Sequence, residues 1–382
     1  MEFAQSEMHR RRAEFAREME RHELQYALVY GANRSGSAVS WLTGWPVTRE
    51  ALLLVAPQPE DDLLLVSFFN HVPQAARVST VAVQWTGARA IATALDVIAS
   101  RASIPGRIGL VGALPFDQYL LLSEHVPVVI DLNPAHTGLR LVKSESELAA
   151  LRRGAELTDA AVTALAETLR PGATDYEVLA QTEHAYSRLG GLHQIHYLGI
   201  TPMDEPVVGV PAQWPTGRVI RDRDLVTCEI SAAAAPEYAG QMLRTFTVGA
   251  PPTSLFAELH AVAEAAFDAV MARLLPGSTA RDLAAAASVI EDAGYTAIDD
   301  VVHGFGGGYL PPIVPGADRP LPTPDFVLAA GMTLVVQPNV VTPDRRAGVQ
   351  TGELLVVTEH GPQRLHEFPR GIRQFGDGPG GA

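Results

Sequence analysis

The chain has 382 residues, 47% hydrophobic and 19% charged, which is typical of a globular protein with more than one domain. Its formal net charge of −14 argues against a surface that binds nucleic acid, and no apolar run reaches the roughly 18–20 residues that cross a membrane. The single cysteine, Cys228, excludes an intramolecular disulfide and fits a cytoplasmic location. It lies in an apolar run, residues 225–230, where a core position is favoured over a nucleophile.

The first 140 residues alternate between apolar runs and helical patterns. Residues 1–24 are charged throughout with apolar residues at helical spacing, which predicts an amphipathic surface helix, and residues 89–101 also have helical character. Short apolar runs typical of buried strands occur at 26–30, 51–56, 62–67, 107–111 and 126–131. This alternation predicts an α/β layer with a mostly buried sheet.

Helix-capping signals open the second half of the chain. Ser144 with Glu147 predicts the start of a long helix over about 146–169, and Thr174 with Glu177 predicts the start of the next. Further strands are expected at 225–230, 244–248, 333–337 and 353–358.

The second capping signal recurs later in the chain. Pro171-Gly172 followed by Thr174 is echoed by Pro276-Gly277 followed by Thr279. Cap chemistry alone can produce such a short match. Because long predicted helices flank both copies and strands follow each, we favour a duplicated α/β unit with any active site between its halves.

Five motifs, in order, resemble the creatinase/aminopeptidase P/prolidase family, whose catalytic domain has the pita-bread fold. They are residues 142–147, the strand pair within 224–249, His303-Gly-Phe-Gly306, Gly331 to Pro338, and 348–361. Residues 40–44 are similar to the N-terminal domain of that family. The resemblance implies an α/β (α+β) protein with an N-terminal creatinase-like domain over 1–140 and a pita-bread domain with an internal pseudo-twofold repeat over 141–368. The polar, Gly/Pro-rich composition of the end of the chain predicts a disordered tail over 369–382.

The family's metal-ligand positions depart from its pattern. Metallopeptidases of this family hold two divalent cations with two aspartates, a histidine and two glutamates. The matching positions in this sequence are Glu229, Gln241, His303, Gln337 and Gly352. Glu353 stands one residue late and, by strand alternation, faces the other way. Because amides are weak ligands, we predict no dinuclear metal site and no cofactor.

Creatinase shows that this fold can split a carbon–nitrogen bond without metal, although its general-base histidine position corresponds to Ala212 here. We therefore predict a metal-independent hydrolase or lyase that cleaves an amide- or amidine-type C–N bond in a small polar molecule. His303, on a glycine-rich turn, would be the acid/base, and Glu229 would orient His303 or polarise the substrate. The alternative for Glu229 is a structural ion pair with Arg244.

Other residues are candidates for substrate binding. The amides of Gln241 and Gln337 suit a neutral polar substrate, although they could also be polar packing in an obsolete site. Arg49 falls near the position from which creatinase donates an arginine across its dimer, and a solvated arginine is the alternative. The remaining candidates are Arg244, Tyr309, Glu353, His193 and His196.

His193 and His196 are three residues apart, which could indicate a metal pair. Two histidines in a stiff apolar segment are more often structural, so no metal is assigned to them. The resemblance places them, with Tyr197, near the edge of the family's cavity.

Two alternative functions remain open. The chain could be a catalytically inactive binding or scaffold protein, or a metal-dependent proline aminopeptidase or dipeptidase whose ligands are misaligned here. The resemblance further implies a homodimer. A small-molecule substrate is expected, and the negative charge and the lack of a long apolar run predict no nucleic-acid or membrane partner.

Overall fold

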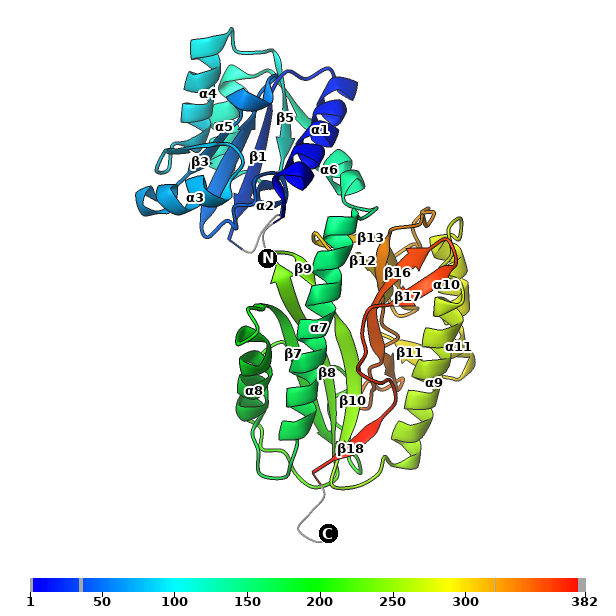
Figure 1. The fold of residues 1–382 in the computed structure, drawn as a ribbon. Helices are drawn as coiled ribbons and strands as arrows, with labels where there is room; N and C mark the ends of the chain where they lie inside the picture. The colour runs from blue at the N-terminus through cyan, green and yellow to red at the C-terminus, as the bar shows by residue number, and fades with distance from the viewer. Residues whose placement is uncertain (1–2, 34–36, 320, 377–382) are drawn as a thin grey trace. The chain divides into compact units, whose positions relative to one another are not determined.

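The computed structural model describes residues 3–33, 37–319 and 321–376, and it divides the chain into two compact units, 1–140 and 141–382 (Figure 1). Within the described residues, the first unit is built on a six-stranded sheet in the order β4-β3-β2-β1-β5-β6. Its elements are α1 (Gln5–Arg21), β1 (Ala27–Ala32), α2 (Ala38–Thr43), β2 (Glu50–Val55), β3 (Leu63–Val66), α3 (Val72–Val78), β4 (Ala82–Trp85), α4 (Ala90–Arg101), β5 (Arg107–Val111), α5 (Phe116–His125), β6 (Val128–Asp131) and α6 (Asn133–Leu139).

Helices cover both faces of this first sheet. Alternate residues of β1 point to opposite faces, so Val29 packs with Phe15 of α1 while Leu28 packs with Ile91 of α4. Burial on both faces explains why the strands read as continuous apolar runs. The pattern did not predict β4, because this strand lies at the sheet edge and is mostly exposed.

The second unit contains a ten-stranded sheet whose main path is β13-β12-β14-β16-β10-β8-β7. Its elements are α7 (Glu145–Thr168), α8 (Asp175–Ser187), β7 (Leu192–Pro202), β8 (Asp224–Ala235), β9 (Tyr238–Ala239), β10 (Met242–Val248), α9 (Ser254–Met271), α10 (Ala280–Ala287), α11 (Val289–Asp292), β11 (Thr296–Ala297), β12 (Asp300–Phe305), β13 (Tyr309–Pro315), β14 (Thr333–Val336), β15 (Val340–Val341), β16 (Gly352–Thr358), β17 (Gly361–Arg364) and β18 (Arg373–Phe375).

The capping signals begin helices where the sequence predicts them. Ser144, Thr174 and Thr279 each form a capping box, and they open α7, α8 and α10. Two successive helix groups, α7–α8 and α9–α11, are therefore each followed by strands of the same sheet, as expected for an internal repeat (Figure 1). Part of the predicted disordered tail is ordered, because β18 pairs with β10, whereas residues 377–382 lie outside the described residues.

Helices cover one face of this sheet, and the other face carries polar side chains. Helices α7 and α8 pack on β7 and β8, and helices α9 and α10 pack against β12 to β14 (Figure 1). Strand register places Ile230, Met242 and Glu353 on one face, because they are paired across neighbouring strands. Their neighbours Glu229 and Leu243 form the next pair along and therefore point to the opposite face.

A buried ion pair joins the two halves of the sheet on the helix-covered face. The Arg244 side chain on β10 donates from Nη2 to Glu353 Oε2 on β16 over 2.7 Å, and from Nη1 to the Gly352 carbonyl over 2.7 Å. Arg364 also donates to both carboxylate oxygens of Glu353. Although burial opposes it, the hydrogen bonds and charges of these arginines lower the pKa of Glu353.

This arrangement corrects one sequence-based alternative. Arg244 does not pair with Glu229, because Arg244 lies beside Cys228 on the opposite face of the sheet. Arg244 and Glu353 are buried and pair with one another, and their predicted role in substrate binding stays a prediction.

We expect Arg244→Met to lower the free energy of unfolding by about 3–5 kcal/mol, because it leaves the Glu353 carboxylate buried with one cation fewer. Urea denaturation followed by circular dichroism measures the change. The control is Arg223→Met, which breaks a solvent-exposed pair with Asp204 and should leave the free energy of unfolding nearly unchanged. Equal losses in the two variants would contradict a special role for the buried pair.

Candidate functional site

Four polar side chains lie on the sheet face opposite the helices, and we call them the polar cluster: Glu229, Gln241, His303 and Gln337. Gln241 Nε2 donates to Glu229 Oε1 over 2.8 Å and to Gln337 Oε1 over 3.2 Å. These side chains are buried and come from β8, β12 and the residues that flank β10 and β14. The structure therefore brings together residues that the sequence analysis selected as candidate site residues.

His303 is fully buried in the polar cluster, where β12 pairs with β14. Its Nδ1 lies 3.1 Å from the Gly304 carbonyl oxygen, which favours the tautomer with the proton on Nδ1. Its Nε2 is then an acceptor, and it makes no hydrogen bond of regular geometry among the described residues, although the Gln337 side chain lies near the ring. Burial lowers the pKa of His303 to about 4, against the opposing effects of the Gly304 carbonyl, Asp300 and Gln337, so the imidazole is neutral at pH 7.

Tyr309 connects His303 to the surface. The two rings stack with centroids 4.1 Å apart, and Tyr309 is 52% exposed while His303 is fully covered. The Tyr309 hydroxyl donates to Asp300, which also accepts from Arg319. Tyr309 is therefore held beside His303 at the surface, and its role in substrate binding stays a prediction.

Glu229 is the acid of the polar cluster. Burial, together with the nearby Asp299 carboxylate, raises the pKa of Glu229 to about 8. Tyr197 on β7 pairs with Glu229 across the strands and shares its face of the sheet. At neutral pH Glu229 is therefore mostly protonated and can donate a hydrogen bond to a ligand.

The polar cluster does not fit the pair of divalent ions that the family resemblance implies. Its four side chains supply one carboxylate, one imidazole and two carboxamides, and amides are poor ligands for zinc-like ions. The fifth position is Gly352, where an added Cβ would lie 2.6 Å from the Val336 carbonyl oxygen. The backbone of β14 therefore closes the position at which a second glutamate would project.

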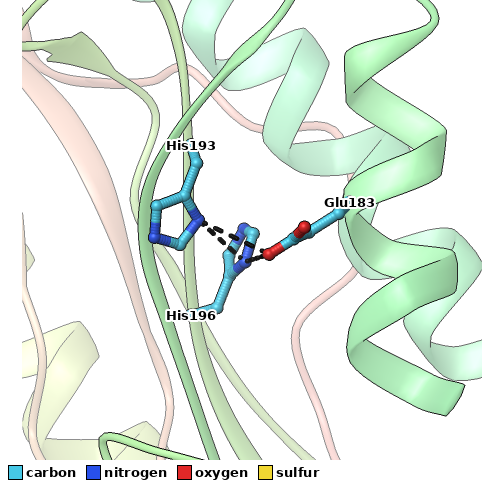
Figure 2. A group of neighbouring side chains, drawn as sticks. All are labelled: Glu183, His193 and His196. Atoms are coloured by element: carbon cyan, nitrogen blue, oxygen red, sulfur yellow. Dashed lines mark hydrogen bonds and ion pairs between the residues drawn. The ribbon is translucent and has the colours of Figure 1, made fainter. Parts of the chain in front are cut away.

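A second group of titratable side chains lies elsewhere on the same unit. His193 and His196 of β7 approach Glu183 of α8, and this set could hold a metal ion (Figure 2). His196 pairs with Ile230 across the strands, so it points to the helix-covered face and away from the polar cluster. The expectation that these histidines lie near the catalytic cavity is therefore corrected, and Glu183 had no signal in the sequence.

Arg49 belongs to the first unit, where its guanidinium carbon lies 5.5 Å from the centre of the Phe68 ring. Its contact with substrate stays a prediction.

The fold and the polar cluster define a two-domain protein of the pita-bread type, and comparison with known proteins agrees. Residues 149–359 match the model of metallopeptidase family M24, and residues 11–142 match the creatinase/prolidase N-terminal domain. The chain belongs to metallopeptidase family M24.

Individual relatives support the same assignment. The chain is 29% identical over 241 residues to the probable dipeptidase PepE of Mycobacterium tuberculosis, covering 60% of each protein. It is 30% identical over 238 residues to the Xaa-Pro dipeptidase of Lactobacillus delbrueckii subsp. lactis, covering 60% of this chain and 61% of that protein. These matches therefore span about three fifths of the relatives' length.

Solved structures extend the similarity of fold to nearly the whole chain. Dipeptidase PepE from Mycobacterium ulcerans superposes with a TM-score of 0.81 at 21% identity, covering 98% of this chain and 99% of that one. The prolidase from Pyrococcus horikoshii OT3 gives a TM-score of 0.78 at 20% identity, covering 94% and 99%. The predicted fold class is confirmed. In the part of the chain that the structure describes, no helix is long and apolar enough to cross a membrane.

The metal-independent, creatinase-like function predicted from the sequence is wrong. Relatives that match the chain are named dipeptidases and Xaa-Pro dipeptidases, and the chain carries a side-chain triad that could hold a metal ion. Two members of this triad, His193 and His196, were interpreted from the sequence as structural rather than as a metal pair, and the third, Glu183, was not a candidate.

We expect Glu229→Gln to stabilise the protein, and the gain should grow with pH. The pKa of Glu229 rises from 4.5 to about 8 on folding, so the folded state holds a proton that the unfolded state has lost in this window. The wild type therefore loses stability as pH rises from about 4.5 to 8, whereas the variant, which keeps the hydrogen bond from Gln241, does not.

Thermal unfolding with chelator present, between pH 5 and 9, measures this difference, which should reach on the order of 5 kcal/mol above pH 8. Glu205→Gln is the matched control, because Glu205 is exposed and should show no such trend. A wild type and a Glu229→Gln variant with parallel pH profiles would contradict a raised pKa.

Proposed function

We propose that this chain hydrolyses short peptides at the polar cluster. The observation that carries the proposal is the position of these four polar side chains, which stand where the family resemblance expects metal ligands. Glu229, Gln241 and Gln337 are hydrogen-bonded to one another, and His303 lies on the same face of the sheet. Relatives named dipeptidase and Xaa-Pro dipeptidase indicate the substrate class. In the reaction, water adds to the peptide carbonyl carbon, the C–N bond breaks, and the amine leaves with a proton.

The proposed roles of the side chains are binding, orientation and the holding of protons. His303 Nε2 is a buried acceptor on a neutral ring, so it can accept a proton or a hydrogen bond from water or from a substrate N–H. Protonated Glu229 can donate to a substrate carbonyl oxygen or to the leaving nitrogen. Gln241 holds Glu229 in position by a hydrogen bond, Gln337 accepts a hydrogen bond from the same Gln241 amide, and Tyr309 borders the site toward solvent.

We expect the purified protein to release free amino acids from members of a dipeptide panel that includes Xaa-Pro and proline-free sequences. His303→Ala should lower kcat/KM by at least about 100-fold, as loss of an acid/base group does. Product release is followed by liquid chromatography with mass detection, once after chelation and once with added Zn²⁺, Mn²⁺ or Co²⁺.

His360→Ala is the control, because it removes an exposed histidine from the turn between β16 and β17. It should leave hydrolysis unchanged. Hydrolysis under either metal condition that depends on His303 supports the proposal. Absence of hydrolysis under both conditions, or full activity in His303→Ala, would overturn it.

We also propose that the chain forms a homodimer through its first unit and acts in the cytoplasm. Phe68, Phe69 and Trp85 are exposed aromatic residues, and the Phe69 and Trp85 ring centroids lie 5.7 Å apart. The Arg49 guanidinium lies over the Phe68 ring, so these exposed aromatic residues are next to Arg49. The family resemblance places Arg49 near a dimer contact, and a cluster of exposed apolar side chains is typical of an interface.

Light scattering after size-exclusion chromatography should therefore give twice the chain mass for the wild type. The double variant Phe69→Ser/Trp85→Ser should shift toward the monomer, whereas Tyr176→Ser, which changes an exposed aromatic residue of the second unit, should not. A monomeric wild type at micromolar concentration would contradict the homodimer.

A further inference from the structure

Three potential ligand atoms converge on the helix-covered face of β7, outside the polar cluster. His193 Nδ1 and His196 Nδ1 lie 3.1 Å apart, and Glu183 Oε1 lies 3.3 Å from His196 Nδ1 and 3.8 Å from His193 Nδ1. Figure 2 shows the two imidazole rings and the carboxylate pointing toward one another from α8 and β7. We call these residues the His-His-Glu triad.

A β-bulge is what places both histidines on the same face. Residues three apart on a regular strand point to opposite faces, because side chains alternate with a period of two. In this structure His193 pairs with Ala232 and His196 with Ile230, so two residues of β7, Gln194 and Ile195, stand against Ser231 alone. The extra residue shifts the alternation by one and aims both imidazoles at α8.

The distances between the three atoms fit a shared ion. Donors about 2.0–2.1 Å from a tetrahedral Zn²⁺ are roughly 3.3 Å apart, which is close to the separations in the triad. Without an ion, the two Nδ1 atoms can share one proton in one hydrogen bond. The Glu183 carboxylate then receives no hydrogen bond from either Nδ1 atom. A cation would engage both nitrogen lone pairs and the carboxylate charge together.

The surroundings keep the buried histidine ready to bind a cation. His196 is buried against the Tyr186 ring, whose centroid is 5.4 Å away, so the imidazole is held on the helix-covered face beside Glu183. Its Nε2 has no hydrogen-bond partner among the described residues, so the proton of the neutral ring can stay on Nε2 and leave Nδ1 free.

We propose that the His-His-Glu triad binds one divalent transition-metal ion of the zinc class. His193 and Glu183 are partly exposed to solvent, so a water molecule can complete a four-coordinate site. The ion would join the C-terminal half of α8 to the start of β7. This site goes beyond the proposed peptide hydrolysis, because it lies on the face opposite Tyr197 and Glu229 and uses none of the polar cluster.

Zinc titration of the chelator-treated, tag-free full chain, followed by dialysis and elemental analysis, tests the proposal. We expect about one equivalent of zinc in the wild type and in His303→Ala. His193→Ala and Glu183→Gln each remove one of three protein ligands, so zinc affinity should fall at least about tenfold, since even groups behind metal ligands contribute about that much. Both residues are exposed at the surface, so these variants keep the buried core intact.

The matched control is His184→Ala, which removes an exposed imidazole next to Glu183 on the same helix. It should retain full zinc binding. A second readout is thermal unfolding, in which zinc should raise Tm in the wild type and in His184→Ala but not in His193→Ala.

Two results would overturn the proposal: a wild type that binds no zinc, or zinc binding that persists in His193→Ala and Glu183→Gln. Loss of zinc in His303→Ala alone would assign the ion to the polar cluster instead. Because every readout here is binding or stability, failure of this proposal is separate from failure of peptide hydrolysis.

Discussion

Side chains along each strand of the second sheet alternate between its two faces, and this alternation determines where the polar groups on the strands point. Neighbouring residues on a strand therefore face opposite sides of the sheet: Glu229 and Tyr197 face one side, whereas Ile230 and His196 face the other. Glu353 shares the side of Ile230, and the position before it is Gly352. One face is covered by α7–α11 and the other carries the polar cluster. Burial on both faces makes the register costly to change, since a slip would move the whole apolar set.

The helix-covered face is not uniformly apolar, and each polar group on it has a specific reason to be there. Arg244 and Glu353 neutralise one another between β10 and β16 and use the backbone carbonyls of neighbouring loops. The His-His-Glu triad lies at the edge strand, where α8 leaves part of it exposed to solvent. Charge in the centre is thus paired internally, whereas charge at the edge is open to an external ion.

The opposite face shows how a site can keep its polarity while its ligands change. Gln241 links Glu229 to Gln337, at positions where the resemblance implies metal-binding acids. The Gln241 amide donates a hydrogen bond to the Glu229 carboxyl group, which would contact a metal ion in such a site. The raised pKa of Glu229 follows, because no positive charge offsets its burial. The Gly304 carbonyl oxygen lies within hydrogen-bond distance of His303 Nδ1, and this contact orients the imidazole.

The sequence by itself determined the family, the fold class, the capping boxes at Ser144 and Thr174, and the membership of the polar cluster. These follow from local chemistry and from motifs whose order along the chain is visible. Only the tertiary structure decided that Arg244 pairs with Glu353, and that Glu183 joins His193 and His196. Such contacts depend on strand register and on a bulge at Gln194, which shift side chains between faces without leaving a distinct pattern in the residues themselves.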